Sequence, residues 1–376
     1  MSSEPDAGVL AVLAGLPGGN PRRLRVLLDH HEPADALARL IAGRPLHPMV
    51  ERAWGGPSGE LRGEIRRAAA TGSVAEAADW CARLGVGVMA RADPAFPAQL
   101  QVDPDPPAIL FWQGDLSVLD ARRVGIIGTR NATASGRATA FELGHELAVG
   151  GVTVVSGLAR GIDGAAHRGV RSGDGRAVGV VANGHDAPYP KPHADLWEWV
   201  GTDGLLLSEW PPGTTPEPWR FPLRNRILAA LCEVLVVVES RERGGSLITA
   251  RAAADRGVEV MAVPGSPRNR ACTGTNALLV DGAAPCTSVD DVLAALGLDH
   301  RRQCELPFDP RPEPDDVEQQ VLAVCGEAPS TLDTIVSTLG IDVAVAAMAV
   351  ARLERWGRLV EAGGWFEPAG SRLERS

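Results

Sequence analysis

Small, hydroxyl-bearing and cationic residues recur in this sequence directly after runs of apolar residues. Glycine lets a backbone approach an anion closely, Ser and Thr cap helices, and free N–H groups at a helix N-terminus favour negative charge. One such segment is usually structural, because Gly is routine where a strand turns into a helix. Five of them with five cations together predict a site for a polyanion or a nucleotide. The candidate residues are Gly128, Thr129, Arg130, Ser156, Gly157, Arg160, Lys191, Arg224, Asn225, Arg226, Gly245, Ser246, Gly265, Gly274 and Asn276.

The apolar runs before these segments have the length of strands. The run at 234–238 is apolar throughout, which is typical of a strand buried on both faces of a parallel sheet. Helical patterns lie between most of the runs, so the sequence predicts a doubly wound α/β domain with a mostly parallel sheet. Ligands of such sheets bind outside the carboxyl ends of the strands, where the candidate residues lie. The expected strands are 86–90, 108–112, 124–127, 152–155, 177–181, 205–207, 234–238 and 258–263, and the expected helices between them are 136–149, 163–170, 225–231 and 246–255.

The chain of 376 residues is long enough for two or three domains. Residues 1–78 read as short helices separated by Gly- and Pro-rich turns, and residues 79–298 form the expected α/β domain. A linker rich in Pro and charge is expected at 299–316. Residues 317–370 show three helical patterns and two short strands, the pattern of a winged helix-turn-helix.

Taken alone, the net charge of −10 argues against a nucleic-acid partner. Its distribution removes that objection: residues 1–120 carry net −4, residues 121–285 net +2 and residues 286–376 net −8. Association depends on the local field, and the segment with the candidate loops is not acidic. Of the 37 basic residues 36 are Arg, and the single Lys191 lies two positions after the single Tyr189.

Several classes of site and location are not indicated. After the first strand there is no G-x-G-x-x-G, and no P-loop or nucleophile elbow follows any strand, so we expect no cofactor. The six Cys and eight His show no metal-ligand spacing, so no metal is expected. Asp163 and His167 could form an acid/base pair, although a capping Asp with a packed His is the simpler interpretation. With no apolar run of 18 residues and no signal segment, we expect no membrane partner and a cytoplasmic location.

Seven sequence blocks occur in order and in register along the middle of the chain. They are Ser156–Asp163 with Ala166-His167, Tyr189-Pro190-Lys191, Ser208-Glu209, Phe221-Pro222 with Arg224-Asn225-Arg226, Ser246-Leu247-Ile248-Thr249-Ala250, Ala262-Val263-Pro264-Gly265 and Gly274-Thr275-Asn276. With these blocks the chain resembles the DprA/Smf (DNA processing protein A) family over roughly residues 80–285. The resemblance implies an extended Rossmann-like domain, and the flanks fit the small sterile-alpha-motif-like or helix-hairpin-helix-like domain and the winged helix that members often carry.

The resemblance further implies a function. Members bind single-stranded DNA, form homodimers, protect incoming strands and load RecA recombinase on them during natural transformation; they are not known as enzymes. Their DNA-contact positions match Arg130 and Lys191, and the blocks at 224–226 and 245–246 line the same region. The chain departs from the family pattern at His185, at Val258 and in the loop before Leu-Ile-Thr, whose sequence here is Gly244-Gly245-Ser246.

An enzymatic alternative remains open at this point. Phosphoribohydrolases of a related Rossmann fold process nucleotides and carry a Pro-Gly-Gly-x-Gly-Thr block with a nearby catalytic Glu. This chain has Pro264-Gly265 and Gly274-Thr275, but they lie far apart and no such Glu accompanies them.

Overall fold

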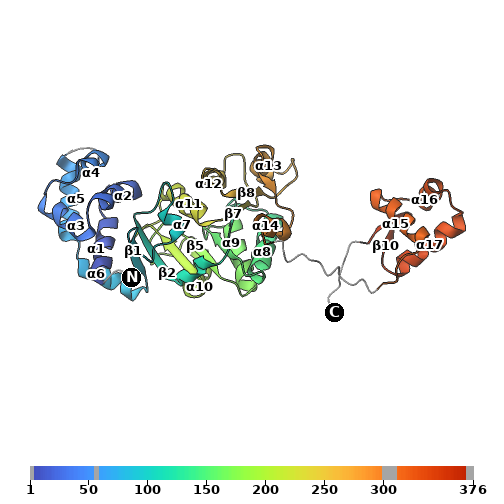
Figure 1. The fold of residues 1–376 in the computed structure, drawn as a ribbon, viewed down its shortest axis with the longest axis horizontal. Coiled ribbons are helices and arrows are strands. Elements are labelled where there is room, and N and C mark those ends of the chain that lie inside the picture. The colour runs from blue at the N-terminus through green and yellow to red at the C-terminus, as the bar shows by residue number, and fades with distance from the viewer. Residues whose placement is uncertain (1–3, 55–58, 299–310, 370–376) are drawn as a thin grey trace. The chain divides into compact units, whose positions relative to one another are not determined.

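The computed structural model describes residues 4–54, 59–298 and 311–369, and the chain divides into two compact units, Met1–His300 and Arg301–Ser376. Figure 1 shows the helices and the sheet of the larger unit and the helices of the smaller one. None of the described helices is long and apolar enough to span a membrane. Residues 299–310 of the expected linker lie outside the described residues.

The described helices before residue 84 pack onto the sheet. Buried side chains of these helices, among them Leu13 and Leu27, share one core with Val88, Ile109 and Phe111 of the first two strands. The structure therefore continues one compact unit across the boundary expected at residue 78. These helices are α1 (Glu4–Ala14), α2 (Pro21–His30), α3 (Pro33–Ala42), α4 (Pro48–Ala53), α5 (Gly59–Thr71) and α6 (Val74–Arg83).

The described strands of the larger unit form one nine-stranded sheet in the order β1-β2-β6-β5-β4-β3-β7-β8-β9. The pairs β1–β2 and β2–β6 are antiparallel, and the pairs from β6 to β9 are parallel. The chain thus has the extended Rossmann-like, mostly parallel α/β fold expected from its sequence. The strands are β1 (Gly87–Ala90), β2 (Ile109–Gly114), β3 (Arg123–Ile127), β4 (Thr153–Ser156), β5 (Ala177–Val180), β6 (Leu205–Ser208), β7 (Val234–Val237), β8 (Glu259–Ala262) and β9 (Ala284–Pro285).

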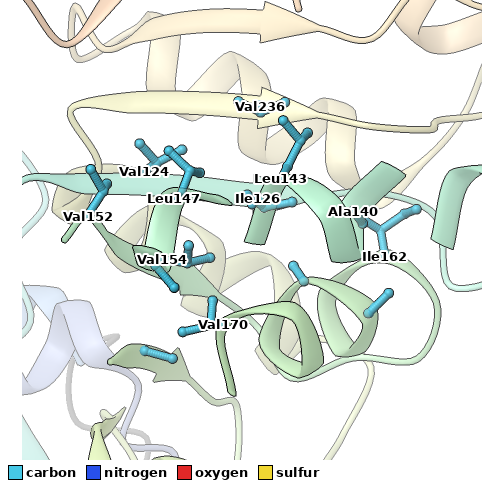
Figure 2. Packing of buried hydrophobic residues seen from close by; sticks show 14 of the residues in the cluster. Val124, Ile126, Ala140, Leu143, Leu147, Val152, Val154, Ile162, Val170 and Val236 are labelled. Atoms are coloured by element: carbon cyan, nitrogen blue, oxygen red, sulfur yellow. The ribbon is translucent and has the colours of Figure 1, made fainter. Parts of the chain in front are cut away.

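Helices cover both faces of the sheet because alternate strand residues are buried on opposite sides. Val124 and Ile126 of β3 pack with one set of helices, as Figure 2 shows, whereas Ile127 packs with the other. The first face is covered by α8 (Ala134–Val149), α9 (Ile162–Ser172), α10 (Ala194–Asp203) and α14 (Val289–Ala295), and the second by α7 (Ala98–Gln101), α11 (Arg220–Leu231) and α12 (Gly245–Ala254); α13 (Thr273–Val280) follows β8.

Two of these helices differ from the expectation. The sequence pattern predicts no helix between residues 181 and 205, where the structure has α10 with Leu196 and Val200 packed into the core. The other, α11, begins at Arg220 rather than at residue 225, because Pro222 falls in its first turn, where a missing N–H costs no helical hydrogen bond.

Glycines allow α8 and α9 to approach closely. A Cβ on Gly144 of α8 would collide with the carbonyl oxygen of Ala166, and one on Gly169 of α9 would collide with that of Phe141. The two helices therefore meet backbone to backbone.

Three histidines are buried among the described residues of the larger unit: His167, His185 and His193. His167 of α9 is fully buried, and His185, which follows β5, is nearly so. Burial lowers the pKa of His167 to about 3 and that of His185 to about 4, because the protonated ring loses its hydration. Among the described residues no hydrogen bond or ion pair joins His167 to Asp163, whose carboxylate accepts from Gly157 and Ala159 instead, so the packed-His interpretation describes the position.

The described part of the smaller unit contains three helices and a hairpin. They pack around Val321, Ile335, Val350 and Leu359. The elements are α15 (Asp316–Glu327), α16 (Leu332–Leu339), α17 (Val343–Arg355), β10 (Leu359–Ala362) and β11 (Trp365–Pro368), the last two being antiparallel.

Overpacking the contact between α8 and α9 should destabilise the larger unit. Gly169→Ala is expected to lower the free energy of unfolding by about 1–3 kcal/mol, because the carbonyl of Phe141 has to move. Gly63→Ala in α5, where a Cβ would lie 3.6 Å from the end of the flexible Arg67 side chain, is the matched control and should be neutral or stabilising by up to about 1 kcal/mol. Urea denaturation measures both, and an unchanged stability of Gly169→Ala would contradict the close contact.

Acid should destabilise the protein partly through His167. The folded protein resists protonation of this ring until about pH 3, whereas an unfolded chain takes up the proton near pH 6.5, so stability is lost as pH falls between these values. His167→Leu should therefore lose about 2 kcal/mol less than wild type in urea denaturation between pH 7 and pH 5. His30→Leu, at an exposed histidine, is the control, and equal pH dependence in His167→Leu and wild type would contradict the assignment.

Candidate functional site

The parallel strands place their carboxyl ends along one rim of the sheet, in the order β5-β4-β3-β7-β8. A pocket of about 470 Å³ opens there between the loops after β3 and β7 and the start of α11. Asp163, Tyr189 and Phe221 also contribute to its wall. Of the residues proposed from sequence, those that line it are Gly128, Thr129, Arg130, Arg224, Asn225, Gly245 and Ser246.

Arg130 is the exposed cation of the pocket. Its guanidinium lies 4.6 Å from the centre of the Phe221 ring, a distance at which a cation is attracted to the ring face. The centre of the Phe221 ring in turn lies 5.9 Å from the centre of the Tyr189 ring. Phe221 and Tyr189 are the aromatic surface available for stacking at the pocket, whereas Trp210 is buried.

Arg224 and Asp163 form the inner wall of the pocket, and both are buried. Burial lowers the pKa of Arg224 to about 10, which leaves it cationic at neutral pH, and Arg224 also donates a hydrogen bond to the carbonyl of Val180. Burial raises the pKa of Asp163, and the positive charge of Arg224 opposes that rise. Gly157 is needed beside them, because a Cβ there would collide with the Arg224 guanidinium.

Carboxylates of the protein itself already occupy two places on this rim that could bind an anion. After β4, Asp163 accepts hydrogen bonds from the N–H groups of Gly157 (3.1 Å) and Ala159 (3.4 Å). At the start of α8, Glu239 accepts from the N–H (2.9 Å) and the hydroxyl (2.6 Å) of Thr133. The loop after β4 was expected to offer its backbone N–H groups to a ligand, but two of them are bound to Asp163.

The N-terminus of α12 differs from those two. Its N-cap is Gly244, which has no side chain to accept from the first turn, and Gly245 has no atom within 4 Å of where a Cβ would be. Ser246 is buried and donates to Ser240 at 2.8 Å. Gly244, Gly245 and Ser246 of this turn line the pocket, and the positive end of the helix dipole favours an anion there.

Arg226 does not line the pocket, although it lies two residues after Arg224. Its guanidinium binds Glu209 at 2.6 Å and Asp105 at 3.3 Å, and Asp105 also pairs with Arg25 of α2. This buried ion-pair group fastens the N-terminal helices to α11. Positions i and i+2 of a helix point in different directions, which separates the two arginines.

Several other proposed residues have local structural roles. Ser156 is buried and donates to the carbonyl of Ile126 at 2.6 Å. Gly265 and Asn276 exchange two hydrogen bonds, of 3.1 and 2.9 Å. The N–H of Gly274 donates to the carbonyl of Ser240 at 2.7 Å, which joins the loop after β7 to the start of α13.

Lys191 and Arg160 are exposed on loops of the same rim, outside the pocket lining. Lys191 begins a short 3₁₀ helix that ends at His193, and the ring of His193 bonds to the carbonyl of Leu158 at 2.9 Å. This bond ties the segment that carries Lys191 to the loop after β4.

Two groups that shape the site are not among the residues proposed from sequence: Glu239, which fills the N-terminus of α8, and Thr249, which lines the pocket. The place of Glu239 directly after a strand is a signal that would have included it. Among the residues that the structure describes, no group of three or more His, Cys, Asp or Glu could hold a metal ion.

Similarity to known proteins shows which family this chain belongs to. The sequence model of DNA recombination-mediator protein A matches residues 87–297. DNA processing protein DprA of Bacillus subtilis is 40% identical over 213 residues, which are 56% of this chain and 72% of that protein.

Two solved structures of proteins with this family's name are similar to this chain. The X-ray structure of DNA processing protein A from Streptococcus pneumoniae superposes with a TM-score of 0.63 at 29% identity, over 78% of this chain and 98% of the other. A structure of DNA processing protein A from Helicobacter pylori, described for its single-stranded DNA binding mode, superposes with a TM-score of 0.52 at 28% identity, over 57% and 96% of the two chains. The chain therefore belongs to the family of DNA recombination-mediator protein A, whose curated members are named DprA or Smf.

Proposed function

We propose that this protein binds single-stranded DNA, without regard to sequence, along the carboxyl rim of its sheet. The observation that carries the proposal is the open N-terminus of α12 beside the exposed Arg130 in one pocket. Backbone N–H groups and cations contact phosphates, which every sequence shares. Tyr189 and Phe221 can stack on bases without selecting one.

The proposal gains support from the Helicobacter pylori relative, which is described as binding single-stranded DNA. We extend it to the family's cellular role: protection of incoming strands and loading of RecA recombinase on them during natural transformation and recombination, by a cytoplasmic homodimer. Recombinase loading onto strands coated with single-strand-binding protein tests this wider role. A chain that binds strands but never accelerates loading would restrict the proposal to binding.

A nucleotide-processing enzyme of the phosphoribohydrolase type is the second candidate, and the chemistry of the pocket disfavours it. The one carboxylate in the lining, Asp163, is engaged by two backbone N–H groups and lies beside Arg224, so it is poorly placed as a free general base. We therefore propose no catalytic role. Incubation with nucleoside monophosphates, followed by detection of released base, would overturn this view if base appeared.

We propose that residues 311–369 form a winged helix that contacts protein rather than DNA. Arg352 of α17 is engaged by Asp315 and Glu318, each at 2.8 Å. This segment contains four Arg and ten acidic residues, which repel phosphate. The exposed side chains of Val343 and Met348 on the same helix leave apolar surface for a protein partner.

Removing two exposed cations of the rim, Arg130 and Lys191, should weaken strand binding. Arg130→Ala and Lys191→Ala should each reduce affinity for an oligothymidylate by about tenfold and lower the slope of log affinity against log salt by about 0.7, the share of one phosphate in a single strand. Fluorescence anisotropy at several salt concentrations measures both quantities.

The control for these two variants is Arg176→Ala, which removes one exposed positive charge at the amino end of β5. It should keep wild-type affinity and slope. Normal binding by the double variant of Arg130 and Lys191 would refute the site.

Neutralising the C-terminal arginines should have no such effect. Arg352→Ala with Arg355→Ala should leave single-strand affinity within about twofold of wild type, because the surrounding acidic groups already disfavour phosphate. A loss as large as that of Arg130→Ala would show that this unit binds DNA directly.

A further inference from the structure

Four arginines on the rim belong neither to the pocket nor to the residues proposed from sequence. Arg241 and Arg243 lie in the loop between β7 and α12, and Arg268 and Arg270 lie in the loop between β8 and α13. All four side chains are exposed, and none has an ion-pair partner or a side-chain hydrogen bond among the described residues. Cations without local partners are available for a ligand.

The backbone brings these two loops together. Strands β7 and β8 are parallel neighbours, so their loops leave the sheet side by side. The hydrogen bond from Gly274 to Ser240 and the lack of room for a Cβ on Gly274 against the backbone at 240–241 hold the two loops in contact. Arg270 begins the short 3₁₀ helix that leads into α13 and is therefore positioned by this same contact.

The charge of this surface is strongly positive for so acidic a chain. The loops at 240–244 and 264–272 contain four Arg and a single acidic residue, Glu242, while the whole chain carries −10. A local excess of this kind attracts a polyanion even on an acidic protein. A phosphate-rich ligand is the chemistry that such a surface fits.

The position of the surface links it to the pocket. Exposed cations follow five successive strands along the rim: Lys191 after β5, Arg160 after β4, Arg130 after β3, and then the two arginine pairs after β7 and β8. Neighbouring strands lie about 4.8 Å apart, so the row extends over roughly 19 Å. A single strand crossing the rim at right angles to the β-strands would meet one cationic loop after another.

We propose that Arg241, Arg243, Arg268 and Arg270 form a second phosphate-binding surface that carries single-stranded DNA onward from the pocket and so sets the length of strand the protein covers. This inference rests on the proposed function, since it needs a strand in the pocket. It predicts a binding site longer than the pocket, within the span of about 4–16 nucleotides that single-strand-binding folds cover.

The test combines strand length with salt dependence. The variant that replaces all four arginines by Ala should bind a short oligothymidylate, just long enough to fill the pocket, as wild type does. It should bind a long one at least about tenfold more weakly, with a salt slope reduced by about 0.7 for each phosphate that the variant no longer neutralises. Replacing the four by Lys should restore most of the long-strand affinity, since charge is retained.

A matched control and the contrary outcomes keep the inference separate from the proposed function. Arg83→Ala with Arg176→Ala removes two exposed positive charges away from this rim and should change nothing. Wild-type affinity and slope of the fourfold variant on long strands would overturn the inference while leaving strand binding intact. Equal loss on short and long strands would also overturn it, because the surface would then not extend beyond the pocket. Failure of the wild-type chain to bind any single strand would overturn the proposed function and this inference with it.

Discussion

Backbone N–H groups at the carboxyl rim of the sheet need hydrogen-bond acceptors. Which of these groups donate to the protein's own carboxylates, and which do not, determines where the candidate site lies. Asp163 serves the loop after β4 and Glu239 serves the start of α8, so two places that could receive a phosphate are closed by the protein's own carboxylates. The first turn of α12 has a glycine N-cap and no such carboxylate. The position of the proposed anion site therefore depends on which N–H groups are already bonded and which are not.

Buried charge has a second role in this molecule, which is to hold its parts together. Arg224 and Asp163 lie together in the pocket wall, whereas Arg226 binds Glu209 and Asp105 at the junction with the N-terminal helices. A buried ion pair is costly to break, because removing one partner leaves the other charge desolvated. Two arginines of one short motif thus have different places: Arg224 lines the candidate pocket, and Arg226 joins the N-terminal helices to α11.

Charge is also segregated along the chain. The flanking segments carry most of the negative charge, while the exposed loops of the rim carry unpaired arginines and the only lysine. Acidic flanks discourage phosphate from binding elsewhere, and the rim keeps a local positive field. A net charge of −10 is compatible with a nucleic-acid ligand for this reason.

The sequence by itself determined the sheet and the rim. The apolar runs from 124 to 263 are strands of the parallel sheet, since hydrophobic runs of that length between helical patterns leave few other folds, and the loops after them lie on one edge as expected. The motifs with Arg130 and Arg224 were recognisable from the sequence. The spacing, however, did not show that Arg224 lines the pocket and Arg226 does not. Nor did it show which loops have their N–H groups bonded to a carboxylate of the protein. Those outcomes depend on contacts between residues far apart in the chain, such as Glu239 with Thr133 and Arg226 with Asp105. Only the packed tertiary structure brings such residues together, because their proximity follows from strand order and helix packing rather than from any local pattern.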